Sequence, residues 1–280
     1  MSAELTELPR PAARSFDTIL LPELGDFRYH VRLPRAADPG RVLVAVHGIS
    51  RQSESMIRWL GEIADEFGYS ILAPHFSNRD FRGYQRLGGI RGGRADSALL
   101  AMIDDAEQMI PGLSQERFFL FGFSGGAQFA HRFMLLQGHR VAAMAVAAAG
   151  WYTPLDYAQK FPWGLGTGRR LKGATLSARK LVSAPSLTMV GVDDVGQDKN
   201  LRLDPRIDEL QGVHRVARAR WWHMHLRRSA NQMQISASHE FRLLPGTGHD
   251  FEQAVLHGSL DRHLFEFCEG HRIRRYEDSS

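Results

Sequence analysis

Apolar residues along the first half of the chain form two alternating kinds of pattern. Residues 41–48, RVLVAVHG, are a continuous apolar run of the kind found in a strand that is buried on both faces. Residues 53–68, SESMIRWLGEIADEFG, have apolar positions at helical spacing, and this pattern ends on Gly68. Such alternation of strands and helices is typical of a mostly parallel sheet with helices packed on it.

The alternation continues toward the C-terminus. Further strands are predicted at YSILAPHF, RFFLFGFS, VAAMAVAAAG, PSLTMVGVDD and HEFRLLPG, and TILLPELGDFRYHVRLP predicts an antiparallel pair at the start. Helices are predicted over residues 96–110, 125–138, 209–234 and 251–270. Together these elements predict an α/β fold, a single doubly wound domain over residues 1–280 with a mostly parallel sheet of eight strands.

A segment between two of these strands, residues 151–183, is rich in Trp, Tyr, Phe, Pro and Gly. It is too short for an independent domain and predicts a lid-like insertion within the single domain. Its first aromatic residues, Trp151 and Tyr152, are candidates for lining an apolar substrate pocket. The alternative, that they pack the insertion onto the core, is equally consistent with the sequence.

Composition limits the compartment and the partners. The 280 residues are 43% hydrophobic, which is enough for a sizeable core, and the single cysteine, Cys268, excludes an intrachain disulfide. The first residues lack the apolar core of a signal peptide, and no segment reaches about 18 uninterrupted apolar residues. We therefore expect a cytoplasmic protein without a membrane partner.

The positive charge comes mostly from arginine. The formal net charge is +4 and the pI is about 9.4, and only four of the 35 basic residues are lysines. Clusters such as HRVARARWW and LRRSANQ fall in helix-like sequence and are interpreted as solvated faces. Nucleic-acid binding needs a concentrated basic stripe or a known module, and the sequence shows neither. No nucleic-acid partner is therefore expected.

The candidate chemistry is concentrated where a predicted strand meets a predicted helix. Gly122-Phe123-Ser124-Gly125-Gly126 fits the pattern Gly-x-Ser-x-Gly in that context. A nucleophile at such a turn has a strained backbone, so the residues two positions away must lack side chains. The turn is expected to lift Ser124 above the sheet and to aim the N–H of Gly125 at a developing oxyanion.

Ser124 needs two partners, because a serine hydroxyl is a poor nucleophile unless a histidine accepts its proton and a carboxylate orients that histidine. Asp193 and Asp194 both follow the strand predicted at PSLTMVGVDD, and His249 follows the strand predicted at HEFRLLPG. Because the carboxyl ends of parallel strands lie at one edge of a sheet, these side chains are expected to converge on Ser124. The residues alone leave the choice between the two aspartates open.

These motifs together resemble the α/β-hydrolase family. The matching pieces, within residues 27–270, are HGIS at 47–50, GFSGG at 122–126, GVDD at 191–194 and GTGHD at 246–250. The resemblance implies that Ser124 is the nucleophile and His249 the base. The family pattern Gly-x-x-Asp after the strand selects Asp194 as the acid.

The resemblance also implies an oxyanion hole and a branch of the family. HGIS places the second donor at the backbone N–H of Ile49, beside that of Gly125, and implies a structural role for His47. The runs HGISRQSESMIRWLGEIADEFGYSILAPHF, GFSGGAQFAHRF and GWYTPLDYAQKFPWGLG are similar to polyhydroxyalkanoate-depolymerase and feruloyl-esterase-like hydrolases. The chain shows neither the export signal nor the polymer-binding domain of secreted depolymerases, which favours a soluble or oligomeric ester.

No metal and no cofactor are expected. His223 and His225 lie two positions apart on a predicted helix, so their side chains point in different directions. His239-Glu240 lacks the second histidine of a zinc-protease motif. The glycine-rich segments LGGIRGGR and GLGTGRR fit neither a phosphate loop nor a dinucleotide-binding pattern.

The sequence therefore predicts a cofactor-independent serine hydrolase, a carboxylesterase that cleaves a small-molecule ester through an acyl-enzyme. The same triad also serves lactonases and thioesterases, and the same scaffold can bind a ligand without turnover, so these alternatives stay open. The sequence does not indicate an oligomeric state.

Overall fold

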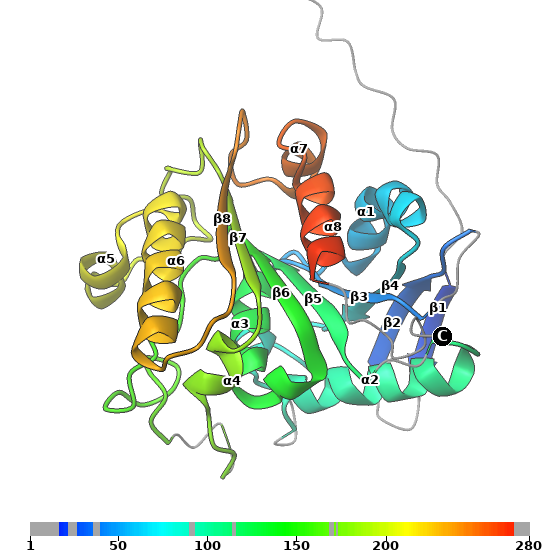
Figure 1. Ribbon diagram of the computed structural model, residues 1–280, viewed down its shortest axis with the longest axis horizontal. Helices are drawn as coiled ribbons and strands as arrows, with labels where there is room; N and C mark the ends of the chain where they lie inside the picture. The colour runs from blue at the N-terminus through cyan, green and yellow to red at the C-terminus, as the bar shows by residue number, and fades with distance from the viewer. Residues whose placement is uncertain are drawn as a thin grey trace, which may run out of the picture.

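The computed structural model describes residues 17–21, 27–35, 40–89, 93–113, 116–167, 171 and 173–271, and Figure 1 shows how they are arranged. Its centre is one sheet formed by β1 (Asp17–Leu21), β2 (Phe27–Arg32), β3 (Val42–Val46), β4 (Ser70–His75), β5 (Phe118–Phe123), β6 (Val141–Ala147), β7 (Ser186–Gly191) and β8 (His239–Leu244). The eight strands lie in the order β1-β2-β4-β3-β5-β6-β7-β8.

The pairing directions follow the predicted pattern. β2 pairs antiparallel with β1 and with β4, and all later neighbours in the sheet are parallel. The predicted α/β fold with a mostly parallel sheet of eight strands is therefore confirmed, as is the antiparallel pairing of the first two strands.

The central strands are buried on both faces, as their continuous apolar sequences predict. Every residue of β3, β5, β6 and β7 is buried. Successive side chains of a strand point to opposite faces. Val44 and Val46 therefore join one hydrophobic core, while Leu43 and Ala45 join the other.

Helices cover both faces of the sheet (Figure 1). One face carries α1 (Ser53–Phe67), α7 (Phe251–Leu256) and α8 (Leu260–Gly270). The other face carries α2 (Ala95–Met109), α3 (Gly125–Gln137), α4 (Ala178–Val182) and α6 (Arg215–Gln232). The short helix α5 (Pro205–Gln211) packs against α6. The parallel strands β5, β7 and β8 thus end at one edge of a sheet that is covered on both sides.

Two helices predicted as continuous are interrupted. The helix predicted over residues 209–234 is α5 followed by α6, and they are separated at Gly212, which has a φ of 99°. The helix predicted over residues 251–270 is α7 followed by α8, and they are separated near Ser259, which has a φ of 51°. Both predictions are wrong for one reason: a residue with positive φ turns the chain out of a right-handed helix, while the apolar spacing continues on each side.

The described parts of residues 151–183, the segment predicted as a lid-like insertion, pack onto the face of the sheet that carries α3 and α6. Tyr152, Phe161 and Leu165 belong to the hydrophobic core on that face. The ring of Tyr152 stacks on the ring of Trp222 of α6, with centroids 4.7 Å apart and planes 8° apart. Buried aromatic contacts therefore anchor this segment to the domain.

Within the ranges that the structure describes, no helix combines the length and the apolar character needed to cross a membrane.

Substitution of Trp222 is expected to test the anchoring of residues 151–183. Trp222 is fully buried, and its ring contacts Tyr152 and His131. Trp222→Ala leaves a cavity at this contact and is expected to lower the free energy of unfolding by about 3–5 kcal/mol in denaturant titrations. The control is Met224→Ala on the same helix, because Met224 is 61% exposed. Equal stability of the two variants would contradict the prediction.

Candidate active site

Ser124 occupies the sharp turn between β5 and α3. Its φ of 53° and ψ of −110° lie outside the regions that residues with a side chain ordinarily adopt. Such strain persists only where the surroundings fix the backbone. Here the N–H of Ser124 donates to the carbonyl of Ala147 at 2.8 Å, and its carbonyl accepts the N–H of Gln128 at 3.1 Å. The serine is thus fixed between the neighbouring strand β6 and the first turn of α3.

The glycines around Ser124 are required by close backbone contacts. A Cβ on Gly122 would lie 2.3 Å from the carbonyl carbon and oxygen of Gly126. A Cβ on Gly126 would lie 2.0 Å from the carbonyl oxygen of Val46, at the end of β3. Atoms do not approach so closely, so the steric reason for Gly-x-Ser-x-Gly is confirmed.

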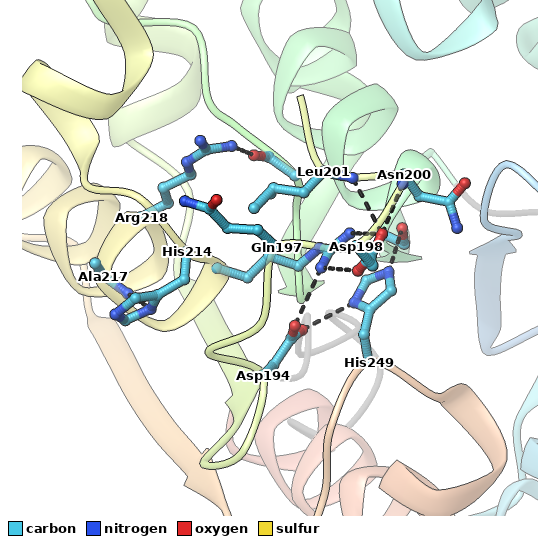
Figure 2. Close-up of polar contacts among 12 residues, drawn as sticks. Asp194, Gln197, Asp198, Asn200, Leu201, His214, Ala217, Arg218 and His249 are labelled. Atoms are coloured by element: carbon cyan, nitrogen blue, oxygen red, sulfur yellow. Dashed lines mark hydrogen bonds and ion pairs between the residues drawn. The ribbon is translucent and has the colours of Figure 1, made fainter. Parts of the chain in front are cut away.

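The imidazole of His249 bridges Ser124 and Asp194. Its Nε2 lies 3.0 Å from Oγ of Ser124, and its Nδ1 lies 2.8 Å from Oδ2 of Asp194. Figure 2 shows the imidazole of His249 directed at the carboxylate of Asp194. When Nδ1–H donates to this carboxylate, Nε2 presents its lone pair to the serine hydroxyl. This arrangement allows the histidine to accept the proton of the serine.

Asp194, and not Asp193, reaches the histidine. Asp194 follows β7 and is 2% exposed, whereas the side chain of Asp193 is exposed. His249 follows β8, which runs parallel to β7, and its ring stacks on Phe123 with centroids 5.5 Å apart. The structure therefore brings together Ser124, Asp194 and His249 from three loops at one edge of the sheet.

The backbone of Ile49, predicted as an oxyanion donor with Gly125, lies next to Gly125 in the structure. The backbone nitrogen of Ile49 is 3.1 Å from the position that a Cβ on Gly125 would occupy. A Cβ on Gly48 would in turn lie 3.6 Å from Cβ of Ser124. The loop after β3 is therefore packed directly against the serine turn, and the backbone nitrogen of Ile49 lies close to Gly125.

His47 holds that loop and does not reach the serine. Its Nδ1 lies 2.7 Å from the carbonyl oxygen of Gly48, and its Nε2 accepts the N–H of Phe76 at 3.0 Å. The hydroxyl of Tyr84 donates to the carbonyl of His47 at 2.8 Å. Complete burial lowers the pKa of His47 to about 3, so the ring is neutral near pH 7. These contacts support the structural role expected for His47.

A cavity of about 300 Å³ opens beside Ser124 and His249, and its size suits a small acyl compound. Its remaining lining consists of the apolar residues Ile49, Met56, Trp59, Phe123 and Phe251, the neutral residues Gly48, Ser50, Gln52, Ser55 and Asn200, and the acidic residues Asp250 and Glu252. Of the described residues that line this cavity, none is a lysine or an arginine. The cavity is therefore mostly apolar or neutral, with two carboxylates.

Trp151 and Tyr152, expected to contact the substrate, do not line this cavity. Trp151 is 3% exposed, and its ring lies against that of Trp163, with centroids 5.1 Å apart, and beneath the guanidinium of Arg132. Tyr152 is fully buried against Trp222. The structure favours the packing alternative, because these ring contacts already bury both side chains.

Arg215 and Asp198 are polar residues at the site that the sequence analysis missed. Nη1 of Arg215 lies 3.2 Å from Oδ1 of Asp194 and 2.6 Å from Oδ2 of Asp198. The hydrogen bond from Arg215 is the main cause that lowers the pKa of Asp198 to about 2. Asp198 is thus a carboxylate near pH 7, and the buried guanidinium lies between two negative charges.

The interpretation of HRVARARWW as a solvated face is wrong for two of its arginines. Arg215 is 1% exposed and Arg218 is fully buried, where it pairs with Asp208 at 2.6 Å. Both lie on the face of α6 that also carries the buried Trp222 and Leu226. This helical spacing was the signal available in the sequence, because a residue three or four positions before a core position shares its face.

In the described portion of the chain, no group of three or more His, Cys, Asp or Glu side chains is arranged so that it could hold a metal ion.

No protein-family model matches the chain, and no curated protein sequence matches it. Several solved structures are similar. They include a poly(aspartic acid) hydrolase from Sphingomonas sp. KT-1, with 22% identity, coverage of 90% of this chain and 97% of that chain, and a TM-score of 0.73. A poly(3-hydroxybutyrate) depolymerase from Bordetella parapertussis has 24% identity, coverage of 95% and 93%, and a TM-score of 0.74. An S-formylglutathione hydrolase from Agrobacterium tumefaciens has 14% identity, coverage of 92% and 95%, and a TM-score of 0.60. The chain therefore has the α/β-hydrolase fold.

Gly126→Ala is expected to disrupt the turn that holds Ser124. The new methyl group collides with the carbonyl oxygens of Val46 and His47, which belong to the backbone and cannot move aside. We expect the free energy of unfolding to fall by about 3 kcal/mol or more in denaturant titrations. Gly196→Ala is the control, because a Cβ there meets nothing within 4 Å. A Gly126→Ala protein as stable as this control would contradict the steric argument.

Proposed function

We propose that this protein is a serine hydrolase, and specifically a carboxylesterase that cleaves a small ester through an acyl-enzyme on Ser124. The observation that carries the proposal is the line of hydrogen-bonding groups from Ser124 through His249 to Asp194, with distances of 3.0 and 2.8 Å. A serine in a strained turn, aligned with a histidine and a buried carboxylate, is the arrangement that activates a hydroxyl for acyl transfer.

In the first half of the proposed reaction, Nε2 of His249 accepts the proton of the Ser124 hydroxyl while Oγ attacks the ester carbonyl carbon. The electron pair of the C=O bond moves to the oxygen, which becomes an oxyanion. This oxyanion accepts hydrogen bonds from the N–H groups of Gly125 and Ile49. The oxyanion then reforms the C=O bond, and the bond to the alcohol oxygen breaks. His249 gives its proton to the departing alcohol, and the acyl group stays on Ser124.

In the second half, a water molecule takes the place of the alcohol. His249 accepts one of its protons as the water oxygen attacks the acyl carbon, and the same two N–H groups bind the second oxyanion. Collapse breaks the bond to Oγ, His249 returns the proton to Ser124, and the carboxylic acid leaves. Asp194 keeps Nδ1–H of His249 oriented in both halves and stabilises the imidazolium that forms in each.

The cavity supports an uncharged substrate. Trp59, Phe123 and Phe251 offer apolar surface for an acyl or alcohol group, while Asp250 and Glu252 repel anions. The similar structures are named as enzymes with different substrates, among them a poly(3-hydroxybutyrate) depolymerase and an S-formylglutathione hydrolase. Their names are compatible with a hydrolase. Whether this protein prefers an ester, a thioester or a lactone is decided by its rates on the three kinds of substrate.

Labelling with a fluorophosphonate probe tests the nucleophile. The intact mass of the wild-type protein is expected to show one adduct, which peptide mapping places on Ser124, and Ser124→Ala is expected to show none. Turnover of a short neutral ester is expected to fall on the order of 10⁴-fold or more in Ser124→Ala. Rates on matched ester, thioester and lactone substrates then identify the preferred bond.

The control for this experiment is Ser236→Ala, because Ser236 is an exposed residue outside the cavity. It is expected to keep both the adduct and the turnover. A folded wild-type protein without any adduct would favour a ligand-binding protein that lacks catalysis.

A pair of matched substitutions tests the acid. Asp194→Asn removes the carboxylate that orients His249, and its kcat is expected to fall on the order of 10⁴-fold. Asp193→Asn makes the same chemical change one residue earlier, on an exposed side chain, and is expected to leave kcat nearly unchanged. Comparable losses in both variants would show that Asp194 does not have the assigned role.

A further inference from the structure

Arg215 lies in a position that is unfavourable for a cation. It is the first residue of α6, where the positive end of the helix dipole repels a guanidinium, and it is 1% exposed. Burial without compensation would be costly for a charge that arginine cannot lose near neutral pH. The compensation comes from two carboxylates, Asp194 and Asp198, both within hydrogen-bonding distance of Nη1.

Asp198 connects this arginine to the wall of the cavity. Its Oδ2 accepts from Nη1 of Arg215, and its Oδ1 lies 3.3 Å from Nη2. The same Oδ1 accepts the backbone N–H groups of Asn200 at 2.6 Å and Leu201 at 3.1 Å, as Figure 2 shows. Asn200 lines the cavity beside Ser124. One carboxylate therefore shapes a cavity loop and pairs with the arginine that contacts the acid.

These contacts form a series of alternating negative and positive charges that ends at His249, the proposed base. Asp198 pairs with Arg215, Arg215 contacts Oδ1 of Asp194, and Oδ2 of Asp194 contacts Nδ1 of His249. Asp194 thus shares its negative charge between a guanidinium and an imidazole. How strongly it stabilises protonated His249 then depends on how much of the charge of Arg215 is neutralised by Asp198.

We propose that Arg215 and Asp198 are positioning residues that together set the basicity of His249 and fix the orientation of Asp194. This inference rests on the proposed function, because basicity at His249 matters for turnover only if the histidine serves as the base. Neither residue contacts Ser124 or the reacting atoms, and both act through Asp194 and His249.

Besides Asp194, Asp198 and Arg215, the charged groups near His249 are Asp250 and Glu252, which follow it in the chain. The charged residues that face it or share its cavity are Asp194 and Asp198 after β7, Arg215 on α6, and Asp250 and Glu252 at the start of α7. The members of residues 48–56 that line the cavity are all neutral, because Arg51 and Glu54 of this segment are not part of the lining. Lys199, next to Asp198 in the chain, is exposed. Arg215 and Asp198 can therefore be substituted without replacing the histidine, its acid or a residue that lines the cavity.

The proposal predicts opposite shifts for two substitutions. Asp198→Asn removes a negative charge and leaves the positive charge of Arg215 to act on Asp194, so the pKa of His249 falls. Arg215→Met removes the positive charge, so the pKa of His249 rises. Because catalysis requires neutral His249, the acidic limb of the kcat/KM profile moves to lower pH in Asp198→Asn and to higher pH in Arg215→Met. Each shift is expected to be on the order of one pH unit.

The experiment measures the pKa of His249 twice. The first measurement is an NMR titration of the His249 ring in a Ser124→Ala background, assigned by loss of the signal in His249→Gln. It needs no turnover, so it gives a result even if the proposed function fails. The second is the pH dependence of kcat/KM on a neutral ester. Opposite shifts in the NMR titration support the proposal, and shifts that are absent or in the same direction overturn it.

Two further variants separate the effect of charge from that of structure. Arg215→Lys keeps the charge but loses the two-pronged contact, so we expect the pKa of His249 to stay near the wild-type value while kcat falls. Asp65→Asn is the matched control, because Asp65 pairs with the buried Arg32 at 2.6 Å on β2, at the other end of the sheet. It is expected to leave the profile in place.

Removal of Arg215 can also prevent folding, because it leaves Asp194 buried without its cationic partner. In that case the Asp198→Asn variant alone tests the proposal. Its amide oxygen can still accept hydrogen bonds from the N–H groups of Asn200 and Leu201, so the loop is expected to keep its shape. A fall in the pKa of His249 supports the proposal, and an unchanged or raised pKa overturns it. Absence of Ser124-dependent turnover in the wild type would instead count against the proposed function.

Discussion

The close approach of α3 to the sheet at Gly126 is the constraint on which the rest of the site depends. Only a glycine lets the first turn of the helix lie against the carbonyl of Val46, and this close approach accompanies the sharp turn at Ser124. The same contact packs the loop after β3 against the turn and so brings Ile49 beside Gly125. The same few backbone contacts therefore fix the positions of Ser124, Gly125 and Ile49, the proposed nucleophile and oxyanion donors.

The charged and titratable groups around this turn are also fixed by specific contacts. His47 is fully buried and kept neutral, so it can support the loop without adding a positive charge near the serine. On the other side, the buried guanidinium of Arg215 is enclosed by two carboxylates. Because Arg215 and Asp194 are buried, water screens their charges little, and the effect of each charge depends strongly on its partners.

The features predicted from the sequence were those with a local signal. The buried strands have continuous apolar runs, and Ser124 lies in a glycine pattern with a steric cause, so both are readable without a structure. The role of Trp151 could not be read in this way, because packing and substrate contact favour the same residue type. Helical spacing indicates that Arg215 is buried, but it does not reveal the partners of Arg215, which lie 17 and 21 residues away in the chain. The breaks at Gly212 and Ser259 depend on backbone angles that apolar spacing does not reveal.

The order of the three residues along the chain has a consequence for how the protein is made. Ser124 and His249 are separated by 125 residues, so the serine leaves the ribosome roughly 6–25 s before its histidine at ordinary rates of translation. In the proposed mechanism, the Ser124 hydroxyl has no proton acceptor until β8 has paired with β7 and His249 is in place. Under that mechanism, a nascent chain is inactive until β8 joins the sheet.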